Sequence, residues 1–254
     1  YTVKPGGKKE AEYEKKDFFK RWLSDPYRRQ YRSIEMFPPG GKPCPKGCLN
    51  LWTGWPIEQV PLDPAANCDL VLQHFEELIP DEKMRKYVLD WHAHKVQRPG
   101  RKIMTCLVLY GLSGAGKSIV SEKTWQAFCL DHYYQTSRVE DLTGQFADNS
   151  QYIVIVLNEA NSKDNVNAAD ALKNCITEET TRREIKCKQA EKNINCCHDS
   201  IATTNNPNAF KLENKADRRY VIVVCASTFS NTKPETMQYM TKLAAQLEDT
   251  KSMR

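Results

Sequence analysis

A glycine-rich loop that joins an apolar run to a helix most constrains how this chain can fold. The run "CLVLY" is followed directly by "GLSGAGKS" at residues 111–118. The positions that fit the pattern G-x-x-x-x-G-K-[ST] are Gly111, Gly116, Lys117 and Ser118. Glycines let such a loop turn so that backbone N–H groups and the next helix N-terminus face phosphate oxygens. The pattern predicts a nucleotide site, and the alternative is a glycine turn with a surface lysine.

Individual residues of the loop have predicted roles toward ATP and Mg²⁺. Lys117 would neutralise the terminal phosphates. Ser118 would place its hydroxyl on Mg²⁺, a cation that prefers oxygen ligands. The residues expected to hold the nucleotide are Gly111, Ser113, Gly114, Ala115, Gly116, Lys117 and Ser118.

A second apolar run, "YIVIVL" at 152–157, ends in Asn158-Glu159. NTPases of this type carry an acidic pair at that point. Glu159 can polarise an attacking water, whereas Asn158 can accept a hydrogen bond but brings no negative charge. We expect Ser118, Asn158 and Glu159 to form the metal site, with a lower Mg²⁺ affinity than an acidic pair would give.

Two further segments place polar side chains beside strands. In "SIATTNNP" (200–207) a β-like run delivers Asn205, which could sense the γ-phosphate and orient the water; an ordinary loop is the alternative. In "KADRRYVIVV", Arg218 and Arg219 stand just before a strand. They could point from one subunit toward a neighbour's nucleotide.

The alternation of elements predicts an α/β domain with a mainly parallel sheet. A helical pair at 69–79 and 81–97 precedes it, separated by Pro80, and a helix at 233–249 follows it. The alternating elements are strands 103–110, 152–157, 200–204 and 220–225, with helices from Lys117 and at 166–178.

The N-terminal region lacks the alternation of strands and helices that the core shows. Residues 8–23 are loosely helical up to Asp25-Pro26, and 37–64 hold seven of the thirteen prolines, which favours an irregular segment. The expected division is 1–66 for this region, 67–100 for a helical lead-in, 101–230 for the core and 231–254 for a C-terminal helix.

Composition and charge narrow the function classes. With 40% hydrophobic and 27% charged residues the chain is globular, and no apolar run approaches the roughly 20 residues that span a bilayer. The net charge is only +5, but basic residues crowd in 21–32, among aromatics, and in 181–192. Each stretch is either a polyanion-binding surface or a solvated face.

Ten cysteines are scattered through strand-like and helix-like segments, which favours free thiols in a reducing compartment. Two groupings could each supply two zinc ligands, "CPKGC" at 44–48 and "CCHDS" at 196–200, but no second pair follows at zinc-finger spacing.

Taken together, these motifs resemble those of superfamily 3 helicases of the AAA+ class, the viral, phage and plasmid primase-helicase type. The likeness runs from about Phe18 to Val224 and includes "NLWTGW", "LDWHAHKVQRPG" and "ALKNCITEET". It implies a P-loop NTPase core in which 111–118 is the Walker A loop. It also implies the Walker B glutamate Glu159, sensor 1 Asn205, an arginine finger at Arg218 or Arg219, and a channel hairpin with Lys186, Lys188 and Lys192 for DNA.

This resemblance implies an ATP-dependent DNA helicase that encircles single-stranded DNA as a ring, expected to be a hexamer, during viral or mobile-element replication. An intracellular site of action, in host cytoplasm or nucleus, goes with that role. The chain begins at Tyr1 rather than Met, and an upstream primase domain is expected. The alternatives are a DNA-holding ring with weak hydrolysis, a protein-remodelling AAA+ ATPase and a monomeric small-molecule kinase.

Overall fold

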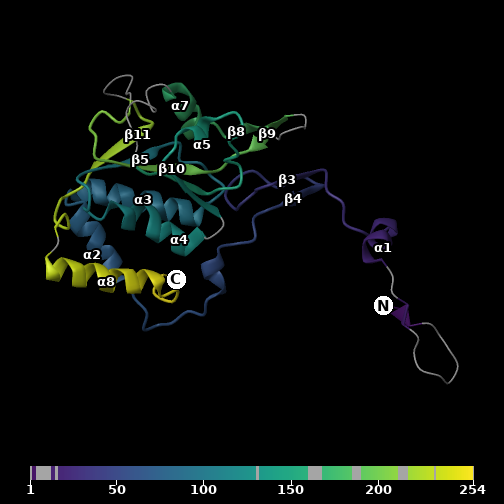
Figure 1. Ribbon diagram of the computed structural model, residues 1–254, viewed down its shortest axis with the longest axis horizontal. Helices are drawn as coiled ribbons and strands as arrows, with labels where there is room; N and C mark the ends of the chain where they lie inside the picture. The colour runs from purple at the N-terminus through teal and green to yellow at the C-terminus, as the bar shows by residue number, and fades with distance from the viewer. Residues whose placement is uncertain are drawn as a thin grey trace. The chain divides into compact units, whose positions relative to one another are not determined.

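The computed structural model describes residues 2–3, 13–14, 17–129, 132–159, 168–184, 190–210, 217–231 and 233–253 (Figure 1). The chain divides into two compact units. One holds residues 1–34 and 45–49, and the other holds 35–44 and 50–254. The division at residues 66, 100 and 230 stays a prediction.

In the first unit, β1 (Thr2–Val3) pairs antiparallel with β2 (Tyr13–Glu14). The helix α1 (Phe18–Ser24) begins after Asp17, whose carboxylate accepts hydrogen bonds from two backbone N–H groups of its first turn. The expected helix from residue 8 is therefore too long, because Tyr13–Glu14 form a strand and the cap sets the start of the helix at Phe18.

The proline-rich stretch contains only short regular elements. They are β4 (Cys48–Asn50), which pairs with β3 (Ser33–Glu35), and the 3-10 turn η1 (Pro56–Gln59). Prolines lack a backbone donor, so longer ladders or helices cannot form there.

The second unit is built on a five-stranded sheet in which every pairing is parallel. The predicted α/β class with a mainly parallel sheet is confirmed. In spatial order the strands are β11 (Tyr220–Val224), β5 (Cys106–Tyr110), β10 (Asp199–Thr204), β7 (Val154–Leu157) and β6 (Tyr133–Thr136). The sequence had not predicted β6.

Helices cover both faces of this sheet, and strand alternation divides the core accordingly. On β5, Leu107 and Leu109 join one hydrophobic cluster, whereas Cys106 and Val108 join the other. The first cluster packs against α2 (Asp69–Leu78), α3 (Glu82–Gln97), α4 (Thr124–Cys129) and α8 (Pro234–Glu248). The second packs against α5 (Glu140–Thr143) and α7 (Ala169–Thr177), on the opposite side in Figure 1. Burial on both faces explains the continuous apolar strands.

The strand β5 begins at Cys106 and not at residue 103. Met104 has φ 65°, which interrupts extended backbone, and the N–H groups of Ile103 and Met104 donate to the Asp199 carboxylate. Asp199 also forms a fully buried ion pair with Lys95 at 2.7 Å. These contacts fix the amino end of β5 against β10 and the end of α3.

Two other features bear on the site. A π-helical turn, η2 (Ile119–Lys123), continues into α4. Between α7 and β10, β8 (Thr180–Arg183) pairs antiparallel with β9 (Glu191–Asn195).

Within the described segments, none of the helices combines the length and apolar character needed to cross a membrane.

Candidate functional site

The loop 111–118 leaves the carboxyl end of β5 in a conformation that needs its glycines. Gly114 and Gly116 have φ of 76° and 92°, in the left-handed region that residues with a Cβ rarely adopt. At Gly116 a Cβ would also come within 2.5 Å of the His74 ring. The path of the loop thus depends on both residues.

Lys117 folds back over the loop that precedes it. Its Nζ donates to the carbonyl oxygens of Gly111 at 2.8 Å and Leu112 at 2.7 Å. Burial lowers the pKa of Lys117, while Cys225 and Glu159 act in the opposite direction. Because both acceptors are neutral carbonyls, a phosphate anion would compete well for this ammonium.

Asn158 and Glu159 continue β7 to the carboxyl edge of the sheet. The N–H of Asn158 donates to the carbonyl of Thr136 at 2.8 Å, which extends the pairing with β6. Glu159 has φ 50°, and its N–H donates to Oγ1 of Thr203 in β10 at 3.2 Å. A non-glycine residue in this region is strained and is held by its surroundings. Contact with β10 therefore helps to position Glu159.

The side chain of Asn158 contains an unsatisfied oxygen. Its Oδ1 is buried and has no hydrogen-bond partner among the described residues. Such an oxygen costs about 1–3 kcal/mol unless a donor or cation satisfies it. Asn158 lines the same cavity as Ser118 and Glu159, where a hydrogen-bond donor or a hydrated cation would satisfy this oxygen.

One cavity of about 550 Å³ brings most of the predicted residues together at the carboxyl ends of β5, β10 and β7. The predicted residues that line it are Ser113, Gly114, Ala115, Gly116, Lys117, Ser118, Asn158, Glu159 and Asn205. Gly111 lies outside the lining, where its N–H donates to the carbonyl of Thr204 at 3.1 Å. Glu122, Ser137 and Thr203 also line the cavity, and sequence reasoning missed them.

Arg218 and Arg219 lie at the opposite end of the sheet. The first residue of β5, Cys106, donates its N–H to the carbonyl of Arg219 at 2.7 Å. At about 3.3 Å per residue, the length of β5 puts the loop 111–118 about 15 Å away. Within its own chain, neither arginine reaches the cavity.

The three lysines that are predicted to contact DNA lie between residues 183 and 195 in the sequence. Lys186 and Lys188 lie outside the described residues, between β8 and β9 in sequence. Lys192 belongs to β9, but its side chain also lies outside the described part of the chain.

His74 supports the loop from behind, and sequence reasoning missed it. Its Nε2 lies 3.0 Å from the carbonyl oxygen of Gly116, so this nitrogen carries the proton. Burial lowers the pKa of His74, with the Gly116 hydrogen bond opposing that shift. The ring stacks on Phe229 at 5.0 Å, and Phe229 stacks on Tyr239 at 4.9 Å. In sequence His74 resembles any other residue on the buried face of α2.

Replacing His74 by leucine is expected to weaken nucleotide binding about tenfold, because the Gly116 carbonyl loses its donor. His74→Gln keeps an amide donor at similar reach and should recover most of the affinity. Titration with a fluorescent nucleotide measures both. Since each variant loses the ring stack, an equal loss of affinity in both would show that the stack and not the hydrogen bond matters, and wild-type affinity in both would contradict a role for His74.

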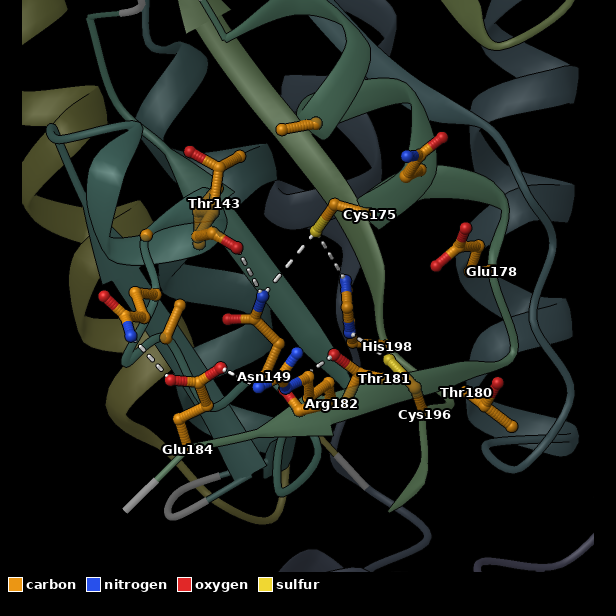
Figure 2. Close-up of a pocket in the computed structure, with 16 residues that line it drawn as sticks. Thr143, Asn149, Cys175, Glu178, Thr180, Thr181, Arg182, Glu184, Cys196 and His198 are labelled. Carbon is orange, nitrogen blue, oxygen red and sulfur yellow. Dashed lines mark hydrogen bonds and ion pairs between the residues drawn. The ribbon is translucent and has the colours of Figure 1, made fainter. Parts of the chain in front are cut away.

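A second cavity, of about 330 Å³, contains a thiol and imidazole cluster (Figure 2). His198 lies between two cysteines, with Nε2 3.3 Å from Sγ of Cys175 and Nδ1 3.1 Å from Sγ of Cys196. One imidazole cannot direct both nitrogens at one metal, and no potential metal-binding group of three occurs among the described residues. Burial raises the pKa of Cys175 to about 11 and also raises that of Cys196, which disfavours thiolates. We assign this cluster no chemistry.

Comparison with known proteins gives a family match and a fold match. Residues 109–219 match a family of unknown function, DUF5906. No curated protein matches the sequence. An apo structure of the NrS-1 C-terminal region aligns with TM-score 0.69 and 19% identity, covering 88% of this chain and 54% of that one. This chain shares the fold of the NrS-1 C-terminal region. It spans about half the length of that structure.

Two more structures are similar. The A form of the NrS-1 C-terminal region aligns with TM-score 0.69 and 20% identity over 88% of this chain and 54% of the other. A ligand-bound crystal structure of JCV helicase aligns with TM-score 0.46 and 10% identity, over 73% of this chain and 52% of that one. The last likeness is too low to support an argument.

Proposed function

We propose that this chain is a nucleotide-hydrolysing module of the superfamily 3 helicase type that acts on single-stranded DNA. One observation carries the proposal. One cavity at the carboxyl ends of parallel strands is lined by segments from three different parts of the chain, namely residues 113–118, Asn158-Glu159 and Asn205. Ligands of open α/β sheets bind at that edge. The helicase assignment itself depends on the sequence resemblance.

The donor set suits ATP with Mg²⁺. Backbone N–H groups of the glycine loop and the Lys117 ammonium would hold the phosphates, and oxygens of Ser118, Asn158 and Glu159 would hold the metal. A bound Mg²⁺ neutralises charge on the phosphate oxygens. The unsatisfied Asn158 oxygen supports a ligand at this position, although the neutral amide gives a weaker site than aspartate.

Three residues of this chain would then have separate roles in hydrolysis. Lys117 stabilises negative charge on the transferring group, since it lines the cavity beside the loop. Glu159 accepts the proton, or a hydrogen bond, from the attacking water. Asn205 lines the same cavity and can orient that water through its amide.

In an assembled particle, an arginine of the adjacent subunit would supply further positive charge at the nucleotide phosphates. Arg219 pairs with the buried carboxylate of Asp217 at 3.5 Å, whereas Arg218 is exposed at the amino edge of the sheet. A side chain in that position can serve only a neighbouring subunit's nucleotide. The ion pair of Arg219 and the exposure of Arg218 favour Arg218 as the finger. A finger that acts on a neighbouring subunit requires an assembly, for which a hexameric ring is predicted.

Arg218→Ala is expected to retain nucleotide binding but to lower turnover by about 10³-fold, because the finger stabilises transition-state charge from the adjacent subunit. Arg219→Ala should act less on turnover and more on stability. Mixing Arg218→Ala with a Lys117→Ala variant should restore part of the activity, since intact cavities then face intact arginines. Normal turnover by both arginine variants would contradict any role in trans.

The experiment that tests the proposed function is ATP hydrolysis with and without single-stranded DNA, combined with the sedimentation size of the particle. A DNA-stimulated ring supports a helicase. Slow hydrolysis by a ring that binds DNA would favour a DNA-holding role, which Asn158 makes the main alternative. A monomer without DNA stimulation would favour a kinase, and stimulation by protein would favour a remodelling ATPase. The upstream primase and the intracellular location remain predictions.

A further inference from the structure

Two short segments with the same pattern pack against each other far from the nucleotide cavity. They are Pro39–Lys42, "PGGK", and Pro99–Lys102, "PGRK". The N–H of Gly100 donates to the carbonyl of Pro39 at 2.9 Å. A Cβ on Gly41 would lie 2.3 Å from the Gly100 oxygen, so only glycine allows this approach. Where the two segments meet, Gly40, Gly41 and Gly100 form a floor that carries no side chains of its own.

Positive charge surrounds this floor. Lys42, Arg98 and Arg101 are exposed, and the two arginines form no ion pair within the described part of the chain. Burial lowers the pKa of the neighbouring His94, and Arg98 and Arg101 lower it further, as expected in a positive field. Among the described residues of the lining, Glu179 is the one carboxylate, 3.4 Å from Lys42. Lys102 is buried and bound to carbonyls at the end of α7.

The surface lies at the base of the β8–β9 pair. Glu179 immediately precedes β8, and Asn195 ends β9; both line a cavity of about 290 Å³ with the glycines. The N–H of Cys196 donates to the Glu179 carbonyl at 3.0 Å, and the Asn195 amide donates to the carbonyl of Met36 at 2.8 Å. The first bond joins the two ends of the β8–β9 pair, and the second holds the end of β9 to Met36.

We propose that Lys42, Arg98 and Arg101 bind the phosphodiester backbone of single-stranded DNA at the base of this hairpin. The choice of DNA as partner rests on the proposed function. The chemistry of the surface favours a phosphate chain over an acidic peptide. Exposed apolar anchors are absent from the described residues of the lining, and the glycines let phosphates approach the backbone. Binding of this kind does not depend on sequence.

The test compares Arg98→Gln/Arg101→Gln with a matched control, Lys83→Gln/Lys86→Gln, at the other end of α3. Binding of a labelled oligothymidylate is titrated without nucleotide at several salt concentrations. The arginine variant should bind more weakly, with a log-log salt slope shallower by about 0.7 for each lost contact. The control variant should match the wild type. An unchanged slope, or an equal loss in both variants, would overturn the proposal.

Glu179→Gln is expected to change the DNA affinity in the opposite direction from the arginine variant. Removing the carboxylate beside Lys42 should strengthen DNA binding, an effect that misfolding cannot imitate. If the wild-type chain hydrolyses ATP and the arginine variant keeps the wild-type DNA affinity, the proposed DNA-binding surface is wrong, while the proposed function stands. Arginine-dependent DNA binding without any ATP hydrolysis would support the surface and refute the proposed function. Tighter binding of a poly-aspartate peptide than of DNA would also overturn the proposal.

Discussion

Replacing Lys117 by alanine is expected to abolish nucleotide hydrolysis, with kcat/KM lower by about 100-fold or more. Among the described residues that line the cavity, Lys117 is the only cation, whereas Glu122 and Glu159 both carry carboxylates. Without the lysine, the cavity would repel the phosphates instead of attracting them. Phosphate release measures turnover, and titration with a fluorescent nucleotide measures binding.

The matched control is Lys123→Ala. Lys123 is exposed on the same helical stretch, where its Nζ donates to the side-chain oxygen of Gln126 at 3.3 Å. This change removes the same charge outside the cavity, so turnover should stay near the wild-type value. Normal hydrolysis by Lys117→Ala would refute the assignment of 111–118 as a phosphate loop.

Glu159→Gln is expected to give a protein that binds nucleotide but hydrolyses it about 10²- to 10⁴-fold more slowly, the range that general-base catalysis contributes. Glutamine preserves the size of the side chain and the hydrogen bond from the backbone N–H to Thr203, so the left-handed turn should persist. Single-turnover hydrolysis separates this chemical defect from a binding defect.

Glu122→Gln is the appropriate comparison, because Glu122 is the second carboxylate among the described residues of the cavity lining. It comes from η2 and not from the end of a strand, and it should affect turnover much less. If Glu122→Gln proves the more damaging change, the base has been assigned to the wrong carboxylate. Similar losses in both variants would point to a shared electrostatic role.

Prediction from sequence worked best where a local pattern is strong. The apolar runs at β5 and β7 are recognisable because both faces of these strands are buried. The edge strand β6 reads "YYQT" and was missed, since it has no continuous apolar run. The start of β5 was placed three residues too early, because the interruption at Met104 depends on Asp199, 95 residues later in the chain.

The sequence by itself determined the class of the fold and the positions of the glycines that let the loop 111–118 turn. Gly114 and Gly116 allow a backbone that other residues resist, and this property is local. Only the tertiary structure decided that β10 lies between β5 and β7, which brings Asn205 to the same cavity as Lys117 and Glu159. Strand order results from packing helices on both faces of the sheet, and no short segment encodes it.

Contacts that support the loop and the glycine floor were also decided by the tertiary structure. The His74 bond to Gly116 and the approach of Gly41 to Gly100 join segments that are distant in sequence. Each depends on the shape of two surfaces that exist only after folding. Likewise, the distance of Arg218 from the cavity follows from the direction of β11, which runs parallel to β5, and it could not be read from the order of the motifs.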